Sequence, residues 1–300
     1  DLEKGNTTMT IQSILKEEYI QAEPDLRIFV RSWLPASPPK AIVAICHGVN
    51  SHSGQYVWVA ERLIAEGYAV YALDLRGRGR SDGERFFVET VDHYVEDLSG
   101  LIDLAVSRHP GLAVFLLGHS AGGVVSASYT LENQEKLAGF ICESFAFQVP
   151  APGFALAVIK GLSHVAPHLG VLRLKNEDFT RDPVALASLN ADPLIANEVQ
   201  PSSTVAALVR ADERLRRDFP QIRIPVFIMH GTADKATVPQ GSQFFYDTVG
   251  SADRKLTLYE DHFHDLLSDV GKEKVMDDIT AWIGARVPAV RPDAVDRSAA

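Results

Sequence analysis

Five residues near the middle of the chain, Gly118-His119-Ser120-Ala121-Gly122, have the types and spacing of a nucleophilic serine. They follow the apolar run 112–117, which has the length of a strand, and precede the segment 123–129, which has a helical pattern. A serine on so sharp a turn adopts a strained backbone, and its glycine neighbours let the strand and helix pack. We therefore predict that Ser120 is a catalytic nucleophile and not an incidental serine in a glycine-rich turn.

A serine hydroxyl is a poor nucleophile, so this hypothesis requires a base and an acid elsewhere in the chain. For a serine between a strand and a helix, the acid and then the histidine follow it in chain order. Asp234 comes just after the buried-strand pattern 224–230, and His264 follows the strand pattern 255–259. The sequence thus predicts a triad of Ser120, Asp234 and His264.

Two of these assignments have a competitor. His262 lies two residues before His264, so both side chains would face the same way in an extended loop, and spacing does not decide between them. We favour His264 because it stands where the loop meets the next helical pattern. Glu143, which ends the strand pattern 137–142, competes with Asp234 for the role of the acid.

The oxyanion that forms during acyl transfer needs two backbone N–H donors. One donor is expected from Ala121, the residue after the nucleophile, and the other from the loop 47–50 after the strand pattern 40–46. Val49 is the predicted second donor, and Gly48 lets the chain bend towards the serine.

Several longer motifs support these assignments over residues 25–285: Ser51-His52-Ser53-Gly54-Gln55-Tyr56, Asp74-Leu75-Arg76-Gly77-Arg78-Gly79-Arg80-Ser81-Asp82-Gly83, Asp192-Pro193-Leu194 and Gly231-Thr232-Ala233-Asp234. With these motifs the chain resembles the monoacylglycerol lipases and lysophospholipase-type enzymes of the α/β-hydrolase superfamily. The resemblance implies the same triad, no cofactor and a small-molecule, lipid-like ester as substrate.

The oxyanion loop departs from H-G-x-G-E-H-S-G-R-Y, the motif typical of monoglyceride lipases. Asn50 stands in place of the second glycine, and Ser51 and Gln55 replace the acidic and basic residues that help bind glycerol. Ala121 replaces the usual methionine. These changes alter the alcohol side, so the alternative is a general carboxylesterase, thioesterase or amidase with another leaving group. A non-catalytic ligand receptor on the same scaffold is a further alternative.

The alternation of strand and helix patterns predicts an α/β fold with a mostly parallel eight-stranded sheet, built from residues 9–143 and 221–286. Within it, strands are expected at 26–33, 41–46 and 68–73, and helices at 56–66, 91–108, 240–249 and 266–285. Residues 144–220 interrupt the alternation, and the resemblance implies that they form a helical cap. We expect residues 1–8, which precede a possible natural start at Met9, and residues 287–300 to be disordered ends.

The first half of the cap segment is rich in large apolar residues, which suit either the cap's own core or a tunnel for an acyl chain. The same residues allow transient contact with a membrane. His47 and His119 flank the serine, and we favour packing or hydrogen bonding over a role as base for both. The candidates for substrate contact are His119, Asn50, Phe147, Phe154 and Leu162.

Composition is that of a globular enzyme, with 46% hydrophobic residues and a net charge of −10, which argues against nucleic acid as a partner. No long uncharged apolar run predicts a membrane span. The two cysteines, Cys46 and Cys142, are expected to be buried free thiols, which suits a reducing cytoplasm. They lack metal-ligand spacing, so no metal site is expected. The sequence carries no signal for an oligomeric state.

Overall fold

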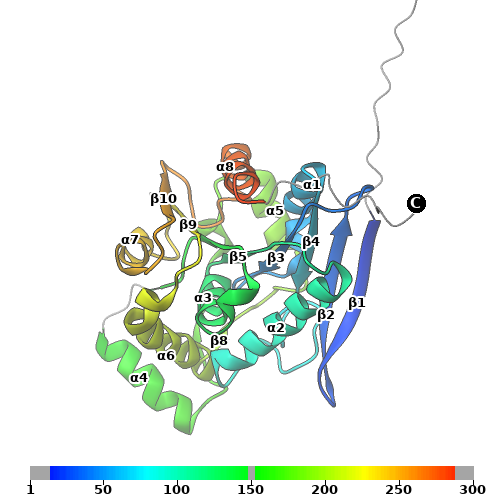
Figure 1. Cartoon of the computed structure of the whole chain (residues 1–300). Coiled ribbons are helices and arrows are strands. Elements are labelled where there is room, and N and C mark those ends of the chain that lie inside the picture. The colour runs from blue at the N-terminus through cyan, green and yellow to red at the C-terminus, as the bar shows by residue number, and fades with distance from the viewer. Residues whose placement is uncertain (1–13, 148–152, 288–300) are drawn as a thin grey trace, which may run out of the picture.

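The computed structural model describes residues 14–147 and 153–287, and its centre is a twisted sheet between two layers of helices (Figure 1). The sheet has eight strands in the order β1-β2-β4-β3-β5-β6-β9-β10. They span β1 Ile14–Glu23, β2 Leu26–Leu34, β3 Ala41–Cys46, β4 Tyr68–Leu73, β5 Val114–His119, β6 Gly139–Glu143, β9 Val226–Gly231 and β10 Arg254–Tyr259. β2 pairs antiparallel with β1 and β4, and the other pairs are parallel, as predicted.

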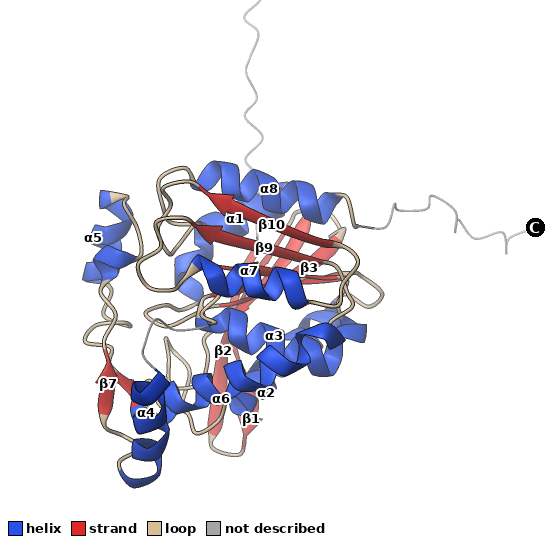
Figure 2. Cartoon of the chain, turned by 90° about the vertical axis from the view of Figure 1, so that its left-hand side faces the viewer, coloured by secondary structure: helices blue, strands red, loops and turns tan. Residues whose placement is uncertain are grey.

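The central strands are apolar along most of their length because helices cover both faces of a parallel sheet. Residues that alternate along β3 enter two separate cores: Ile42 and Ala44 face one, and Val43 and Ile45 face the other. On one face lie α2 Val91–Arg108, α3 Ala121–Asn133 and α7 Pro239–Thr248, and on the opposite face lie α1 Val57–Ala65 and α8 Lys272–Gly284. Figure 2 shows these layers edge-on.

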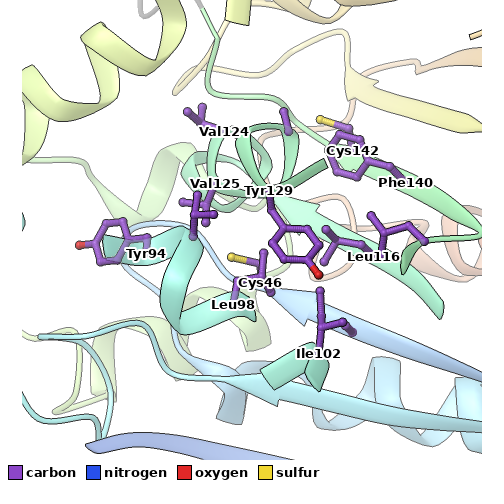
Figure 3. Packing of buried hydrophobic residues seen from close by; sticks show 14 of the residues in the cluster. Cys46, Tyr94, Leu98, Ile102, Leu116, Val124, Val125, Tyr129, Phe140 and Cys142 are labelled. Carbon is purple, nitrogen blue, oxygen red and sulfur yellow. The ribbon is translucent and has the colours of Figure 1, made fainter. Parts of the chain in front are cut away.

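The first core is a close packing of α2 and α3 against the sheet (Figure 3). Tyr129 of α3 and Leu98 of α2 are fully buried in it. The two thiols, Cys46 and Cys142, belong to the same cluster and are buried and free, in agreement with the prediction. Burial raises the pKa of the Cys46 thiol to about 12, so it stays protonated at neutral pH.

The described part of residues 144–220, the predicted cap, holds three α-helices and a short two-stranded ribbon. Their bounds are α4 Gly153–Val165, β7 Gly170–Leu172, α5 Pro183–Ala191, β8 Gln200–Pro201 and α6 Ser202–Asp218. Figure 1 shows α4 beside α6 at the edge of the molecule. Ala207, Ala211 and Leu215 of α6 join the same buried cluster as α2 and α3, so this helix fastens the segment to the core.

Two elements differ from the sequence expectations. Strand β1 was not predicted, because its residues are charged or exposed along most of its length and it lies at the sheet edge. The helix expected over 266–285 begins only at Lys272, so the prediction was wrong for its first residues. Gly271 enters that helix with φ of +92°, and the carboxylate of Asp269 accepts the N–H groups of Arg181 and Phe263, which holds the preceding loop.

The expectations for residues 1–8 and for 288–300 lie outside the described residues. In the described part of the chain, none of the helices combines the length and the apolar character that crossing a membrane requires.

Candidate active site

Ser120 stands at the turn between β5 and α3 with φ of 56° and ψ of −122°, a conformation that non-glycine residues rarely adopt. Backbone hydrogen bonds hold it there: its N–H donates to the carbonyl oxygen of Glu143, and its carbonyl accepts from Gly123 and Ala146. The turn thus has the backbone strain predicted for a nucleophilic serine, and its neighbours supply the bonds that maintain it.

Glycine is required where this turn meets the loop after β3. A Cβ at Gly122 would collide with the carbonyl oxygens of Cys46 and His47, and a Cβ at Gly48 would lie 2.8 Å from the Cβ of Ser120. The loop and the serine turn therefore approach as closely as their backbones allow, which brings loop N–H groups to the serine.

Three side chains form one hydrogen-bonded chain at this edge of the sheet. The Ser120 hydroxyl donates to Nε2 of His264 at 2.8 Å, and Nδ1–H of His264 donates to Oδ2 of Asp234 at 2.8 Å. All three side chains are buried. This is the order of contacts that lets an imidazole take the proton of a serine hydroxyl. The structure brings the predicted triad together, and the catalytic role of the three residues stays a prediction.

The carboxylate of Asp234 is held by more partners than the triad requires. Its Oδ1 accepts the N–H groups of Ala236 and Thr237, and its Oδ2 also accepts from the Thr237 hydroxyl and from Nε2–H of His230 at 2.9 Å. Burial alone raises the pKa of this carboxyl, but His264 and His230 outweigh that effect and hold it far below its usual value. Asp234 is therefore ionised.

His230 is a partner of Asp234 that the sequence analysis missed. Its Nδ1 accepts a hydrogen bond from the Ser242 hydroxyl at 2.7 Å, which leaves Nε2–H to donate to Asp234. Burial lowers the pKa of His230, so the ring is a neutral donor. The available signal was a histidine at the end of a buried strand, four residues before the predicted acid.

The competing residues are engaged elsewhere. Nδ1–H of His262 donates to the carbonyl oxygen of Glu260. Glu143 is completely buried beside Asp265, and its Oε1 accepts the N–H of Leu267. Burial and the charge of Asp265 raise the pKa of Glu143 well above its ordinary value. Neither residue takes part in the hydrogen-bonded chain from Ser120 through His264 to Asp234, so the geometry favours His264 as the base and Asp234 as the acid.

Glu143, Asp265 and His119 have side chains of the types that bind metal ions, and they lie close together. One potential ligand atom from each lies within 4.8 Å of the others, behind the triad. Burial raises the pKa of both carboxyls and, together with His264, lowers the pKa of His119 to about 3. Burial thus disfavours the charged forms of the two carboxyls, which are the forms that bind a metal ion.

The two predicted oxyanion donors, Val49 and Ala121, line the same cavity as Ser120. Ala121 is the first residue of α3, so its N–H has no acceptor within the helix and lies at the positive end of the helix dipole. The two N–H groups are suited to bind a developing oxyanion, and this role stays a prediction.

Hydrogen bonds of the His47 ring hold the loop that carries Val49. His47 accepts the N–H of Leu75 through Nε2 and donates through Nδ1 to the carbonyl oxygen of Gly48. Burial lowers the pKa of His47 to about 4, although Asp74 opposes this effect, so the ring stays neutral. This agrees with a role in hydrogen bonding and not in proton transfer.

The motifs Asp74 to Gly83 and Asp192 to Leu194 hold this loop to the cap segment. The buried guanidinium of Arg78 forms an ion pair with Glu198, whose carboxylate also accepts the N–H of Asn50 at 3.1 Å. Asp192 accepts from Nε2 of His52 at 2.7 Å and from the amide of Gln55 at 3.3 Å. Burial raises the pKa of Asp192, but the hydrogen bond from His52 lowers it below its usual value.

Ser120 opens into a cavity of about 300 Å³ between the core and the cap segment. Its walls are largely apolar and come from Ala146, Leu172, Leu174, Val205, Leu208 and Ala236. Charged side chains also border it: Arg173, Lys175, Asp178 and Lys235. Such a cavity accommodates a small apolar molecule with a few polar groups. Of its apolar wall, Leu172 belongs to the apolar run of the cap segment that the sequence offered for a tunnel, and the other residues were not identified.

The residues predicted to contact substrate lie away from this lining, as far as their side chains are described. Phe147 is fully buried among other phenylalanines, including Phe219, and the ring of His119 lies behind that of His264, with centroids 5.0 Å apart. Asn50 donates to Asn176 across the loop. Leu162 is half-buried on α4, and the Phe154 side chain lies outside the described residues.

Comparisons with known proteins agree with this geometry. A model of the family described as serine aminopeptidase S33 matches residues 37–271. The chain is similar to a monoacylglycerol lipase of Mycolicibacterium smegmatis, with 30% identity over 91% of this chain and 98% of that protein. It is also similar to the monoglyceride lipase of Homo sapiens, with 30% identity over 86% of this chain and 87% of that protein.

Among solved structures, the crystal structure of a monoacylglycerol lipase from Paleococcus ferrophilus superposes with a TM-score of 0.79. It shares 26% identity with this chain and covers 86% of it and 99% of its own length. The observed strand order and the flanking helices are thus those of the α/β-hydrolase fold.

Proposed function

Because the chain belongs to the serine aminopeptidase S33 family and is a serine hydrolase, we propose that it hydrolyses lipid-like carboxylic monoesters through an acyl-enzyme on Ser120. The observation that carries the proposal is the hydrogen-bonded chain from Ser120 through His264 to Asp234 at the wall of an apolar cavity. The names of the two lipase relatives support a monoacylglycerol or a similar monoester as substrate.

In the proposed reaction, Nε2 of His264 takes the hydroxyl proton as Oγ of Ser120 bonds to the ester carbon. The N–H groups of Val49 and Ala121 bind the carbonyl oxygen, which becomes an oxyanion. When the intermediate collapses, the bond to the alcohol breaks, and the alcohol leaves with the proton from His264. Water then attacks the acyl-enzyme in the same way and restores Ser120. Asp234 keeps the imidazole in the required tautomer and stabilises its charged form.

The base must be a neutral imidazole, so activity should rise through the weakly acidic range and then level off. His47 and His119 do not complicate this profile, because burial lowers their pKa values to about 4 and about 3. A flat profile down to about pH 4 would contradict a histidine base.

The contacts of the oxyanion loop bear on which alcohol leaves. The amide of Gln55 donates to Asp192, and the amide of Asn50 donates to Asn176, so two of the residues that depart from the lipase motif have partners within the protein. These contacts favour a general carboxylesterase as the second candidate, because they leave fewer polar groups for glycerol.

The test is a profile of kcat/KM over esters of increasing acyl length, including 1-monoacylglycerols, with Ser120→Ala as the baseline. Efficient hydrolysis of medium or long acyl chains and of monoacylglycerols supports the lipase. High activity on short esters with little on monoacylglycerol supports the carboxylesterase instead. Hydrolysis of no ester, together with failure of a fluorophosphonate to label the wild type at Ser120, would refute both.

A further inference from the structure

Three cations border the mouth of the cavity that contains Ser120: Arg173, Lys175 and Lys235. All three are exposed, and within the described chain no carboxylate forms an ion pair with any of them. Among the described residues that line the cavity, Asp178 is the one carboxylate. The mouth therefore carries an excess of positive charge, although the whole chain has a net charge of −10.

Two of these cations stand on one short extended segment after β7. Leu172 and Leu174 are half-buried, while Arg173 and Lys175 are exposed, which is the alternation expected of an extended chain. All four residues line the cavity. The leucines thus form part of its apolar wall, and the two cations form its solvent-facing edge.

The third cation comes from a distant part of the chain. Lys235 follows the acid of the triad in the loop after β9, and its ammonium lies 4.0 Å from the ring centroid of Phe263. This contact holds the lysine by a cation–π interaction. Positive charge from the cap segment and from the core therefore meets at one opening, which no single stretch of sequence predicts.

We propose that the enzyme selects esters that carry a negatively charged group, a carboxylate or a phosphate, on the part of the molecule that projects from the cavity. Arg173, Lys175 and Lys235 are then the residues that determine this specificity. The apolar wall binds the carbon skeleton, the ester group meets Ser120, and the anionic group reaches the cations. The inference rests on the proposed ester hydrolysis and adds the charge of the substrate.

Each partly hydrated ion pair at such an edge changes the rate about two- to five-fold, because water screens exposed charges. The three together are therefore expected to favour an anionic ester by about ten- to one-hundred-fold over its neutral counterpart. Attraction between exposed charges acts over a Debye length of about 10 Å at 0.1 M salt, so the preference should weaken as salt increases.

The experiment compares kcat/KM within two matched pairs of substrates, used as monomers in solution. The first pair is 4-nitrophenyl hexanoate and mono-4-nitrophenyl adipate, which places the charge at the acyl end. The second is 1-lauroylglycerol and 1-lauroylglycerol 3-phosphate, which places it at the alcohol end. Preference for the anionic member of either pair, reduced on going from about 0.02 M to about 0.5 M NaCl, supports the proposal and identifies the charged end.

The variants separate this effect from a general loss of activity. In the triple variant Arg173→Gln, Lys175→Gln, Lys235→Gln, kcat/KM should fall about ten- to one-hundred-fold more for the anionic ester than for its neutral counterpart, so that the anionic preference is lost. Asp178→Asn should raise kcat/KM for the anionic ester about two- to five-fold. The matched control is Lys255→Gln, because the ammonium of Lys255 lies 4.5 Å from the Phe227 ring centroid but does not border the cavity.

The control variant Lys255→Gln should leave the ratio of kcat/KM for the anionic ester to kcat/KM for the neutral ester unchanged. If the triple variant is unfolded by circular dichroism, Arg173→Gln and Lys175→Gln are tested singly, since both side chains are exposed. A preference for the neutral member of both pairs overturns the inference, and so does an equal loss on neutral and anionic esters in the variants. Failure of the proposed function is distinguishable, because no ester would then be hydrolysed above the Ser120→Ala baseline.

Discussion

Asp234→Asn is the most informative single substitution in the site, because the surroundings dictate how the new amide must be oriented. Oδ1 of Asp234 accepts two backbone N–H groups, from Ala236 at 2.8 Å and Thr237 at 2.9 Å. An asparagine must place its carbonyl oxygen there, since backbone N–H groups can only donate, whereas the Thr237 hydroxyl can rotate and the rings of His264 and His230 can move their protons to the other nitrogen. The NH₂ group then occupies the position of Oδ2, next to Nδ1 of His264.

This orientation reverses the hydrogen bonds of the histidine. The amide NH₂ donates to Nδ1 of His264, so the ring proton moves to Nε2. That proton now points at Oγ of Ser120, 2.8 Å away, and the ring no longer accepts the hydroxyl proton. We expect kcat to fall about 10³- to 10⁴-fold, which corresponds to about 4–5.5 kcal/mol of transition-state stabilisation.

The assay is the steady-state hydrolysis of the best ester, with Ser120→Ala as baseline and Glu143→Gln as the matched control. Glu143 is also a buried acid near the site, but its Oε1 accepts the N–H of Leu267, and it takes no part in the hydrogen-bonded chain from Ser120 through His264 to Asp234. The variant Glu143→Gln should therefore retain activity within about ten-fold of the wild type. If Asp234→Asn keeps more than about a tenth of wild-type activity, or if Glu143→Gln alone abolishes turnover, the assignment of the acid is wrong.

Three further predictions concern the buried groups around the site. Burial raises the pKa of Glu143 above its ordinary value of 4.5, so its contribution to stability is full at low pH and is lost as the pH rises. The Tm of Glu143→Gln relative to wild type should therefore be higher at about pH 8 than at about pH 4, and calorimetry showing equal differences would contradict this. Burial raises the pKa of Cys46 to about 12 and that of Cys142 well above its usual value, so Ellman's reagent should react with neither thiol until guanidinium unfolds the protein. In Gly122→Ala, the new methyl group meets the carbonyl oxygens of Cys46 and His47, and chemical denaturation should show a loss of about 1–3 kcal/mol; an unchanged midpoint would mean that the turn has room to relax.

The parts of the site that the sequence predicts are those encoded by short segments. Strand, serine turn and helix are contiguous around Ser120, so glycine spacing and local apolar patterns suffice to identify them. Asp234 and His264 each follow a strand of the same parallel sheet, and their approach follows from the chain order of that sheet. His230 was missed because a histidine within an apolar strand looks like a core residue until its partner is placed.

The edge of the sheet and the cavity were harder to predict because neither depends on local pattern. β1 is held by its backbone ladder with β2 and by ion pairs such as Glu18 with Arg108, so its side chains need not alternate between apolar and polar. The cavity draws on residues from the core and from the cap segment, far apart in the chain. Phe147 has the apolar character of a substrate contact, but the phenylalanines around it bury it completely.

The buried ion pair of Arg78 with Glu198 explains why a charged motif belongs to a site whose chemistry needs none of its charges. Glu198 comes from the cap segment and accepts the N–H of Asn50, next to the predicted oxyanion donor Val49. A movement of the cap that separated the pair would leave a buried charge unpaired, at a cost of about 3–5 kcal/mol. We therefore expect the ion pair, with the hydrogen bond from Arg78 to Gln200, to hold residues 198–200 against the loop 47–50.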